Sequence, residues 1–358
     1  MSFGLIDKLT IYYSDIMPPR MEPHLRGFYF WEYQLSVHNE KFVKVDFPNT
    51  HSTRIYSRLN RIKDSFNKST LFQKIQPIAG QIISVAEPTG RVSILDEPEV
   101  VRERRTENQV AIMTANLWHD WPRQRMLKER LGCFVQLVLH EGIDILLLQE
   151  VTRTKDFRMD EWLAEKLGMA YVYSRANGHE GGIGFEEGLA VFSRFPIEEP
   201  RIAQLSLHKN PFFRRIALGA KIKIEDQELL AYSVHLGIKG NQNELQLSRL
   251  IKWVEGQSDG LPTVIGGDFN ASEKTSQIRD AQDFWFDSFR ELNPDKDGFT
   301  HKILWPWGGI LSRSRLDYLF LNRGKPGWKV GEARQVEIDG CPVSDHTPVL
   351  LKAFLPGK

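Results

Sequence analysis

Seven short polar motifs of the chain each place a carboxylate, an amide or an imidazole at one end of an apolar run. In chain order they are Thr114-Ala115-Asn116, Leu148-Gln149-Glu150, Glu187-Gly188-Leu189-Ala190, Val234-His235-Leu236, Gly267-Asp268-Phe269-Asn270, Arg315-Leu316-Asp317-Tyr318 and Ser344-Asp345-His346. Carboxylates and amides bind hard divalent cations, and an imidazole moves protons near neutral pH. If the apolar runs are buried strands, their polar ends form one cleft assembled from distant parts of the sequence.

Each motif alone has an ordinary structural explanation. A single carboxylate after an apolar strand, such as Glu150, is more often a solvated strand end. A single histidine such as His235 is more often a satisfied structural residue. The set is more specific than any of its members, because a chance chain would rarely contain all seven in this order.

Composition narrows the class of protein. The 358 residues suffice for one large domain or two modest ones. With 47 Lys+Arg against 46 Asp+Glu the net charge is +1, so a site for a polyanion must be local. Two cysteines, Cys133 and Cys341, form no disulfide framework or metal-ligand spacing, and we expect two reduced thiols in a reducing compartment. No signal peptide and no apolar run of about 18 residues is visible, which predicts a cytoplasmic protein without a transmembrane segment.

The chain changes character near residue 107. The preceding segment, residues 95–108, is strongly charged and contains a proline, which is typical of a linker or an exposed connecting strand. We therefore predict two parts, an N-terminal extension over residues 1–106 and a larger domain over residues 107–358. The extension is interpreted as a substrate-selecting module, an oligomerisation element or a packed cap, and the oligomeric state stays open.

Downstream of residue 108, apolar runs alternate with segments of helical periodicity. The predicted strands cover residues 110–114, 143–148, 189–193, 216–222, 229–234, 262–266, 316–321 and 348–354. The predicted helices cover residues 123–140, 160–167 and 243–256. Runs that are apolar on both faces belong to sheets covered on both sides. The pattern predicts a layered α/β domain with helices outside two packed sheets.

With these motifs, the region from about residue 109 to about residue 355 resembles the endonuclease/exonuclease/phosphatase superfamily of metal-dependent phosphohydrolases. That superfamily includes deoxyribonucleases, abasic-site endonucleases, deadenylases, neutral sphingomyelinases and inositol polyphosphate 5-phosphatases. The resemblance covers roughly two-thirds of the chain and every motif of the family's site. It implies a four-layered α/β sandwich, a Mg²⁺ or Mn²⁺ cofactor and hydrolysis of a phosphoester.

The resemblance also assigns roles on the metal side of the site. It implies that Glu150 binds the cation, that Asn116 lies beside it, and that Asp345 completes the protein contacts. It further implies that His346 faces the scissile phosphate and is oriented by Asp317. Whether His346 acts as a base or as a cation that stabilises the phosphate stays open at this point.

The remaining three motifs complete the expected catalytic set. By resemblance, Asp268 positions the nucleophile or the leaving group, and the amide of Asn270 donates to a phosphate oxygen. In the deoxyribonuclease branch, the second histidine pairs with a glutamate seven residues before an arginine. Glu187 and Arg194 have that spacing, so we predict a Glu187–His235 pair. The abasic-site branch has a tyrosine in this part of the site, which His235 disfavours.

Two further stretches are candidates for substrate binding. Trp305 and Trp307 lie in a predicted loop rich in proline and glycine. Three alternatives stay open for them: stacking on bases, insertion into a lipid surface, or packing back over the core. Arg214 and Arg215 either grip a flanking phosphate or begin a strand as ordinary snorkelling arginines.

We therefore expect a Mg²⁺-dependent phosphodiester hydrolase that acts on nucleic acid. The alternatives are a sphingomyelinase-like or inositol-phosphate hydrolase with peripheral lipid contact and, more distantly, an inactive binding module. The near-zero net charge disfavours a strongly salt-sensitive grip on long duplexes. It fits short, single-stranded or damaged ends, or a small phosphodiester.

Overall fold

The computed structural model describes residues 40–46, 91–99, 109–206, 214–305, 309–323 and 327–355. Contacts divide the chain into two units, Met1–Glu40 and Lys41–Lys358, and nearly all described residues belong to the second. Most of the predicted N-terminal extension and Trp307 lie outside the described residues.

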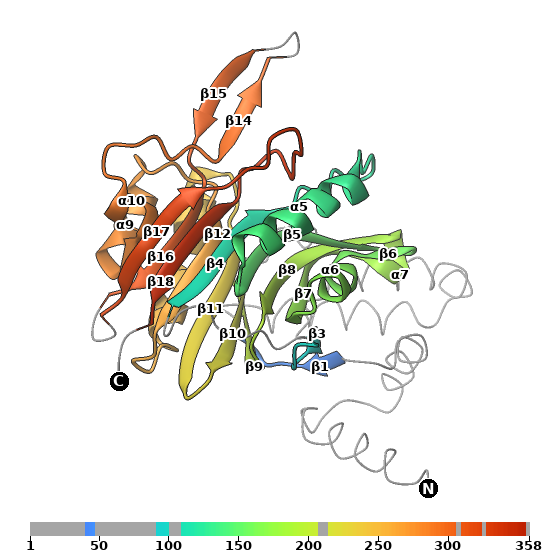
Figure 1. The fold of residues 1–358 in the computed structure, drawn as a ribbon, viewed down its shortest axis with the longest axis horizontal. Helices are drawn as coiled ribbons and strands as arrows, with labels where there is room; N and C mark the ends of the chain where they lie inside the picture. Colours follow the sequence, from blue (N-terminus) through green and yellow to red (C-terminus); the bar gives the residue numbers. More distant parts are fainter. Residues whose placement is uncertain are drawn as a thin grey trace, which may run out of the picture. The chain divides into compact units, whose positions relative to one another are not determined.

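Two large β-sheets form the centre of the described fold (Figure 1). The first sheet has the strand order β1-β3-β7-β8-β5-β4-β18-β17, with β6 paired to β5. Its strands are β1 (Glu40–Phe42), β3 (Arg91–Leu95), β4 (Gln109–Asn116), β5 (Ile145–Thr154), β6 (Phe157–Arg158), β7 (Ala170–His179), β8 (Phe185–Ser193), β17 (Lys329–Gln335) and β18 (Val349–Phe354). The second sheet has the order β13-β16-β12-β11-β10-β9-β2. Its strands are β2 (Val45–Asp46), β9 (Ile197–Gln204), β10 (Ile216–Ile224), β11 (Gln227–His235), β12 (Thr263–Asp268), β13 (Trp285–Asp287) and β16 (Asp317–Asn322).

Within the described residues, the short strands β1, β2 and β3 precede residue 107 and belong to these sheets. β3 pairs with β7 of the first sheet, and β2 pairs with β9 of the second. The boundary at residue 107 stays a prediction, but parts of the sequence before it contribute strands to the same two sheets.

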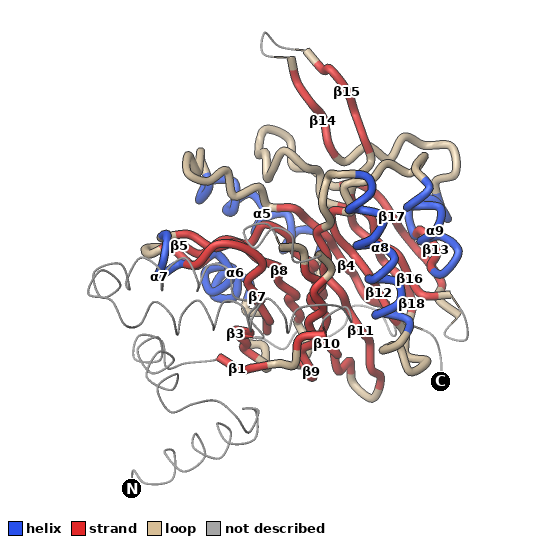
Figure 2. The backbone as a smooth tube through the Cα atoms, turned by 180° about the vertical axis from the view of Figure 1, so that it is seen from behind, coloured by secondary structure: helices blue, strands red, loops and turns tan. Residues whose placement is uncertain are grey.

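Helices cover the outer faces of both sheets. The described helices are α5 (Leu127–Glu141), α6 (Met159–Leu167), α7 (Glu180–Ile183), α8 (Gly240–Glu255), α9 (Ser276–Phe284) and α10 (Ser288–Leu292). Helix α10 differs from the covering helices, because its Phe289 packs between the two sheets. In Figure 1, α5 and α6 lie in front of the first sheet, and in Figure 2, which shows the reverse side, α8 lies in front of the second. The predicted four-layered α/β sandwich is confirmed.

Alternation along a strand explains why four layers form. Successive side chains of β4 point to opposite faces, so Ile112 packs between the sheets while Met113 packs with Phe134 of α5. On the second sheet, Tyr232 of β11 packs outward with Leu250 of α8. Both faces of these strands are therefore buried, which is why their sequences are nearly continuous apolar runs.

Cys133 on α5 and Cys341 in the segment before β18 form a disulfide bond. The sequence predicts two reduced thiols, and this prediction is wrong. The fold brings the two Cα atoms to 5.6 Å, a separation that a disulfide spans. The residues lie 208 positions apart, so no local spacing indicated the pair. The cytoplasmic location, which rested partly on reduced thiols, stays a prediction.

Strand register brings the polar motifs together. β11 and β12 are parallel with His235 opposite Asp268, and β12 and β16 are antiparallel with Asp268 opposite Asp317. In the first sheet, parallel β4 and β5 place Asn116 beside Gln149, the residue before Glu150. Motifs distant in sequence therefore lie at neighbouring strand ends.

A separate two-stranded ribbon is formed by β14 (His301–Leu304) and β15 (Ile310–Ser314), which projects from the sandwich in Figure 1. None of the helices in the described ranges has the length and apolar character needed to cross a membrane.

Close packing of β11 against β12 generates a stability prediction. A Cβ added to Gly267 would lie 1.9 Å from the carbonyl oxygen of Val234, which cannot retreat without disturbing the ladder. We expect Gly267→Ala to lower the free energy of unfolding by about 1–3 kcal/mol in urea titrations followed by circular dichroism. Gly132→Ala in α5 is the control, because its Cβ meets nothing within 4 Å. It should stabilise by roughly 0.5–1 kcal/mol. Equal stability of Gly267→Ala and wild type would contradict the described register.

Candidate active site

His346 and Asp317 form a buried imidazole–carboxylate pair. Nδ1 of His346 lies 2.8 Å from Oδ2 of Asp317, which confirms the predicted contact. Thr300 supports the pair, because its Oγ1 accepts the backbone N–H of Asp317 and its carbonyl accepts that of Thr347. Thr300 thus ties the backbone of Asp317 to that of Thr347, the residue after His346.

The charges around His346 decide its protonation. Burial by itself lowers the pKa of His346, but the negative charges of Asp317 and Asp268 outweigh it and raise the pKa to about 10. In this arrangement the imidazolium is the stable form at neutral pH. His346 is therefore suited to donate a hydrogen bond to a phosphate oxygen rather than to accept a proton.

Asp268 lies at the centre of the cluster and is almost fully buried. Its Oδ2 is 3.2 Å from Nδ2 of Asn116, 3.4 Å from Nε2 of His235 and 3.9 Å from Nε2 of His346. Burial, and next the charge of Asp317, raise the pKa of Asp268 to about 7. A carboxyl that titrates near neutrality is suited to proton transfer.

Asn270 is held beside Asp268 in a left-handed conformation with φ 48°. Its backbone N–H donates to Oδ1 of Asp268, and its Nδ2 lies 2.9 Å from the carbonyl oxygen of Leu236 and 3.2 Å from Oδ2 of Asp268. The predicted donation to a phosphate oxygen stays a prediction, and it requires the amide to exchange one of these partners.

Glu150 is aimed into the cleft by a β-bulge. The ladder between β5 and β8 shifts register between Leu148 and Val151, and Glu150 has φ 56°. A left-handed glutamate is uncommon and costly, as is typical of functional positions. Burial and then the charge of Glu187 raise the pKa of the Glu150 carboxyl. A bound cation would relieve both effects.

Asn116 connects the two carboxylates that come from different sheets. Its Nδ2 is 3.2 Å from Oε1 of Glu150 and 3.2 Å from Oδ2 of Asp268. Its Oδ1 accepts the backbone N–H of Trp118. In this arrangement Asn116 orients the carboxylate of Glu150 and joins it to the histidine side of the site.

The structure pairs Glu187 with a histidine that sequence reasoning missed. Nε2 of His119 lies 2.9 Å from Oε2 of Glu187, and Nδ2 of Asn177 donates to Oε1 of Glu187. His235 has its Nε2 3.4 Å from Oδ2 of Asp268 and lines a small cavity together with Glu187, so the predicted Glu187–His235 pair stays a prediction. His119 lies three residues after Asn116, and a search continued past the strand end would have found it.

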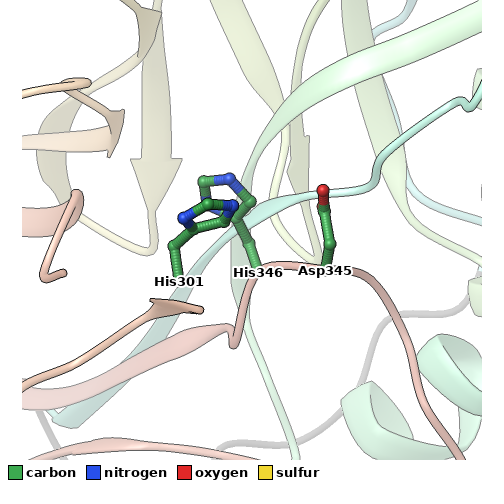
Figure 3. Close-up of side chains that lie close together, drawn as sticks. All are labelled: His301, Asp345 and His346. Atoms are coloured by element: carbon green, nitrogen blue, oxygen red, sulfur yellow. The ribbon is translucent and has the colours of Figure 1, made fainter. Parts of the chain in front are cut away.

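His301 is a second residue that the motifs did not reveal. Its ring lies 4.6 Å from that of His346, and a backbone bridge joins the two residues. Ligand atoms of His301, Asp345 and His346 lie within 4.8 Å of one another, and their side chains project to the same side of the chain (Figure 3). The β14–β15 ribbon therefore begins directly beside the catalytic candidate.

Oxygen donors suited to a divalent cation are present. The carboxylates of Glu150 and Asp345 are of the type that Mg²⁺ and Mn²⁺ prefer. The charge of Asp345 contributes to the raised pKa of Glu150, so the two groups act on each other. The chemistry of these donors fits a divalent cation, while their sharing of one cation stays a prediction.

The residues predicted to bind substrate lie in different environments. Arg214 is buried, and its Nε donates to the carbonyl oxygen of Ala176, while its predicted contact with substrate stays a prediction. Arg215 lines a small cavity together with Glu150 and His235, which places it at the site. Trp305 follows β14 and is 41% exposed.

Comparison with known proteins agrees with this geometry. A family model described as "Endonuclease/Exonuclease/phosphatase family" matches residues 113–346. The uncharacterized protein YbhP of Escherichia coli K12 is 29% identical over 140 residues, which are 36% of this chain and 53% of YbhP. YbhP of Shigella flexneri gives the same values. The chain thus spans about half the length of the curated relatives it matches.

Solved structures are similar in fold. An endonuclease/exonuclease/phosphatase family protein from Leptotrichia buccalis has a TM-score of 0.56 at 20% identity, with 68% of this chain and 99% of that chain covered. The human nocturnin catalytic domain has 0.54 at 17%, covering 74% and 97%. A mannosyl-6-phosphatase from Bacteroides thetaiotaomicron has 0.53 at 20%, covering 68% and 99%.

The Asp317–His346 pair generates a prediction about stability and pH. Because folding raises the pKa of His346 from 6.5 to about 10, the pair stabilises the fold fully below about pH 6.5 and loses this contribution as pH rises through about 10. The stability advantage of wild type over Asp317→Asn should therefore shrink between about pH 6 and pH 10. Urea unfolding across this range, with a chelator present, measures it.

A stability difference that stays constant over this pH range would mean that Asp317 does not hold the imidazolium. His140→Ala is the control for histidine titration in general, because the His140 side chain is 80% exposed and remote from the cluster.

Proposed function

Because the chain belongs to the endonuclease/exonuclease/phosphatase family, whose members are metal-dependent hydrolases of phosphoester bonds, we propose that it is a Mg²⁺- or Mn²⁺-dependent phosphodiester hydrolase acting on nucleic acid. The observation that carries the proposal is the double contact of Asn116. Its amide joins Glu150, the expected cation ligand, to Asp268, which neighbours His346. Cation binding and proton transfer thus belong to one site.

The side chains divide the reaction between them. Glu150 and Asp345 would hold a divalent cation, which neutralises charge on the phosphate when bound. Asp268, with a pKa of about 7, accepts the proton of the attacking water through a carboxylate oxygen. His346, held as an imidazolium by Asp317, donates to a phosphate oxygen as charge develops there.

A groove beside His346 supports a substrate larger than a single phosphate. It runs between the β14–β15 ribbon and the segment before β18, and its volume is about 610 Å³. Lys302 and Arg313 line it together with the carboxylates of Glu337, Asp339 and Asp345, and Trp305 is exposed at the end of β14. Cations with an exposed aromatic suit the phosphates and bases of a short single strand.

A phospholipid is the second candidate substrate, and a specific observation favours it. Ile303, Ile310 and Leu311 of the ribbon are each more than 40% exposed. Exposed aliphatic side chains do not stack on bases, but they do insert into a lipid surface. The substrate therefore has to be decided by direct comparison.

The decisive experiment is a substrate panel with Mg²⁺, containing single-stranded DNA, duplex DNA, RNA, sphingomyelin vesicles, inositol phosphates and bis-nitrophenyl phosphate. We expect hydrolysis of single strands, which His346→Ala reduces at least about 100-fold while circular dichroism stays unchanged. Glu150→Ala should raise the Mg²⁺ concentration needed for activity, because a cation ligand is lost. His140→Ala is the matched control and should keep wild-type rates.

Each outcome of the panel has a definite meaning. Activity confined to sphingomyelin vesicles would replace the nuclease assignment by the lipid one. Absence of hydrolysis across the panel, with folded protein, would overturn the enzymatic proposal. An unfolded His346→Ala protein would assign His346 a structural role.

A further inference from the structure

His119 lies between two carboxylates of the first sheet. Its Nε2 is 2.9 Å from Oε2 of Glu187 and 3.5 Å from Oε2 of Glu150. Its backbone N–H also donates to Oε2 of Glu150. One residue therefore contacts the expected cation ligand through both its main chain and its side chain.

The second oxygen of each carboxylate, Oε1, is held by an asparagine amide. Oε1 of Glu150 accepts from Nδ2 of Asn116, and Oε1 of Glu187 accepts from Nδ2 of Asn177. Each carboxylate thus has one oxygen bound by an asparagine amide and presents the other to His119. With both oxygens engaged, neither carboxylate is free to rotate.

The aromatic surroundings hold the His119 ring in place. Its centroid lies 4.9 Å from that of Phe185, which stacks on Trp121 at 4.7 Å. The backbone N–H of Trp121 donates to Nδ1 of His119 at 3.0 Å. The ring is thereby fixed in position and in orientation.

This last hydrogen bond decides what Nε2 does. The ligand atoms of His119, Glu150 and Glu187 cluster within 4.8 Å, a geometry that also suits three ligands of one metal ion. However, a backbone N–H only donates, so Nδ1 must accept and the ring proton must lie on Nε2. A histidine that binds metal through Nε2 instead donates from Nδ1. The geometry therefore favours His119 as a hydrogen-bond donor to Glu187 over His119 as a metal ligand.

We propose that His119 is a positioning residue for the hydrolytic site. Its backbone N–H holds Oε2 of Glu150 in one orientation, and its Nε2–H, which donates to Glu187 and lies 3.5 Å from Glu150, offsets the repulsion between the two carboxylates. The cation then meets a preorganised carboxylate and loses less affinity to side-chain reorientation. This inference rests on the proposed function, since it assumes that Glu150 binds the cation.

The test measures Mn²⁺ binding by electron paramagnetic resonance and does not depend on turnover. Loss of an outer partner of a metal ligand typically weakens metal affinity by 10–100-fold, so we expect His119→Ala to raise the Kd for Mn²⁺ by about 10-fold or more. His119→Gln retains an N–H donor at similar reach and should recover part of the affinity. His140→Ala, a distant exposed histidine, is the control and should bind Mn²⁺ like wild type.

Kinetics provide a second readout. If His119 only positions Glu150, then His119→Ala should raise the Mg²⁺ concentration for half-maximal activity, while kcat at saturating Mg²⁺ stays within several-fold of wild type. A structural role would lower both thermal stability and kcat without rescue by glutamine.

Two results would overturn the proposal. An unchanged Kd for Mn²⁺ in a folded His119→Ala protein would remove the positioning role. A ¹⁴N coupling to bound Mn²⁺ that disappears in His119→Ala would make His119 a direct ligand instead. If wild-type protein binds Mn²⁺ with the expected His119 dependence but hydrolyses no substrate, the proposed function fails while the positioning role stands.

Discussion

Burial of several carboxylates in one cleft is the constraint on which the rest of the site depends. The group comprises the buried Asp268 and Asp317 and the partly buried Glu150 and Glu187. Removing such charges from water is costly unless each is paired or hydrogen-bonded. Every one of these carboxylates accordingly contacts an asparagine amide, an imidazole or both. The pKa values of Glu150 and Asp268 stay raised because their partners do not fully compensate for the loss of hydration.

The backbone aims these groups by departing from regular strands. The β5–β8 ladder is bulged before Val151, and the β7–β8 ladder is bulged between Arg175 and Asn177. A bulge changes which face a side chain occupies. The first bulge turns Glu150 into the cleft, and the second lies next to Asn177, the amide that anchors Glu187. Irregularity in the first sheet is therefore part of how the site is built.

Helix α5 holds two segments of the site that are far apart in sequence, the one after β4 and the one before β18. Arg130 donates to the carbonyl oxygens of Leu117, just after β4, and of Val343, just before the last polar motif. The disulfide from Cys133 to Cys341 ties the same helix to the same segment. Two neighbouring positions on one helix thus hold the segment after Asn116 and the segment before His346 in register. Such rigid support is what a preorganised site requires.

The sequence by itself determined the layers and the strand ends of this protein. Apolar runs buried on both faces require a covered sheet, and a polar residue at the end of such a run lies at the sheet edge whatever the register. The Asp317–His346 pair followed from the same pattern and a family resemblance. The tertiary structure alone decided which partners meet: Glu187 takes His119, and the two cysteines join across the domain. The physical reason is that partner choice depends on bulges and strand register, where a shift of one residue turns a side chain to the other face.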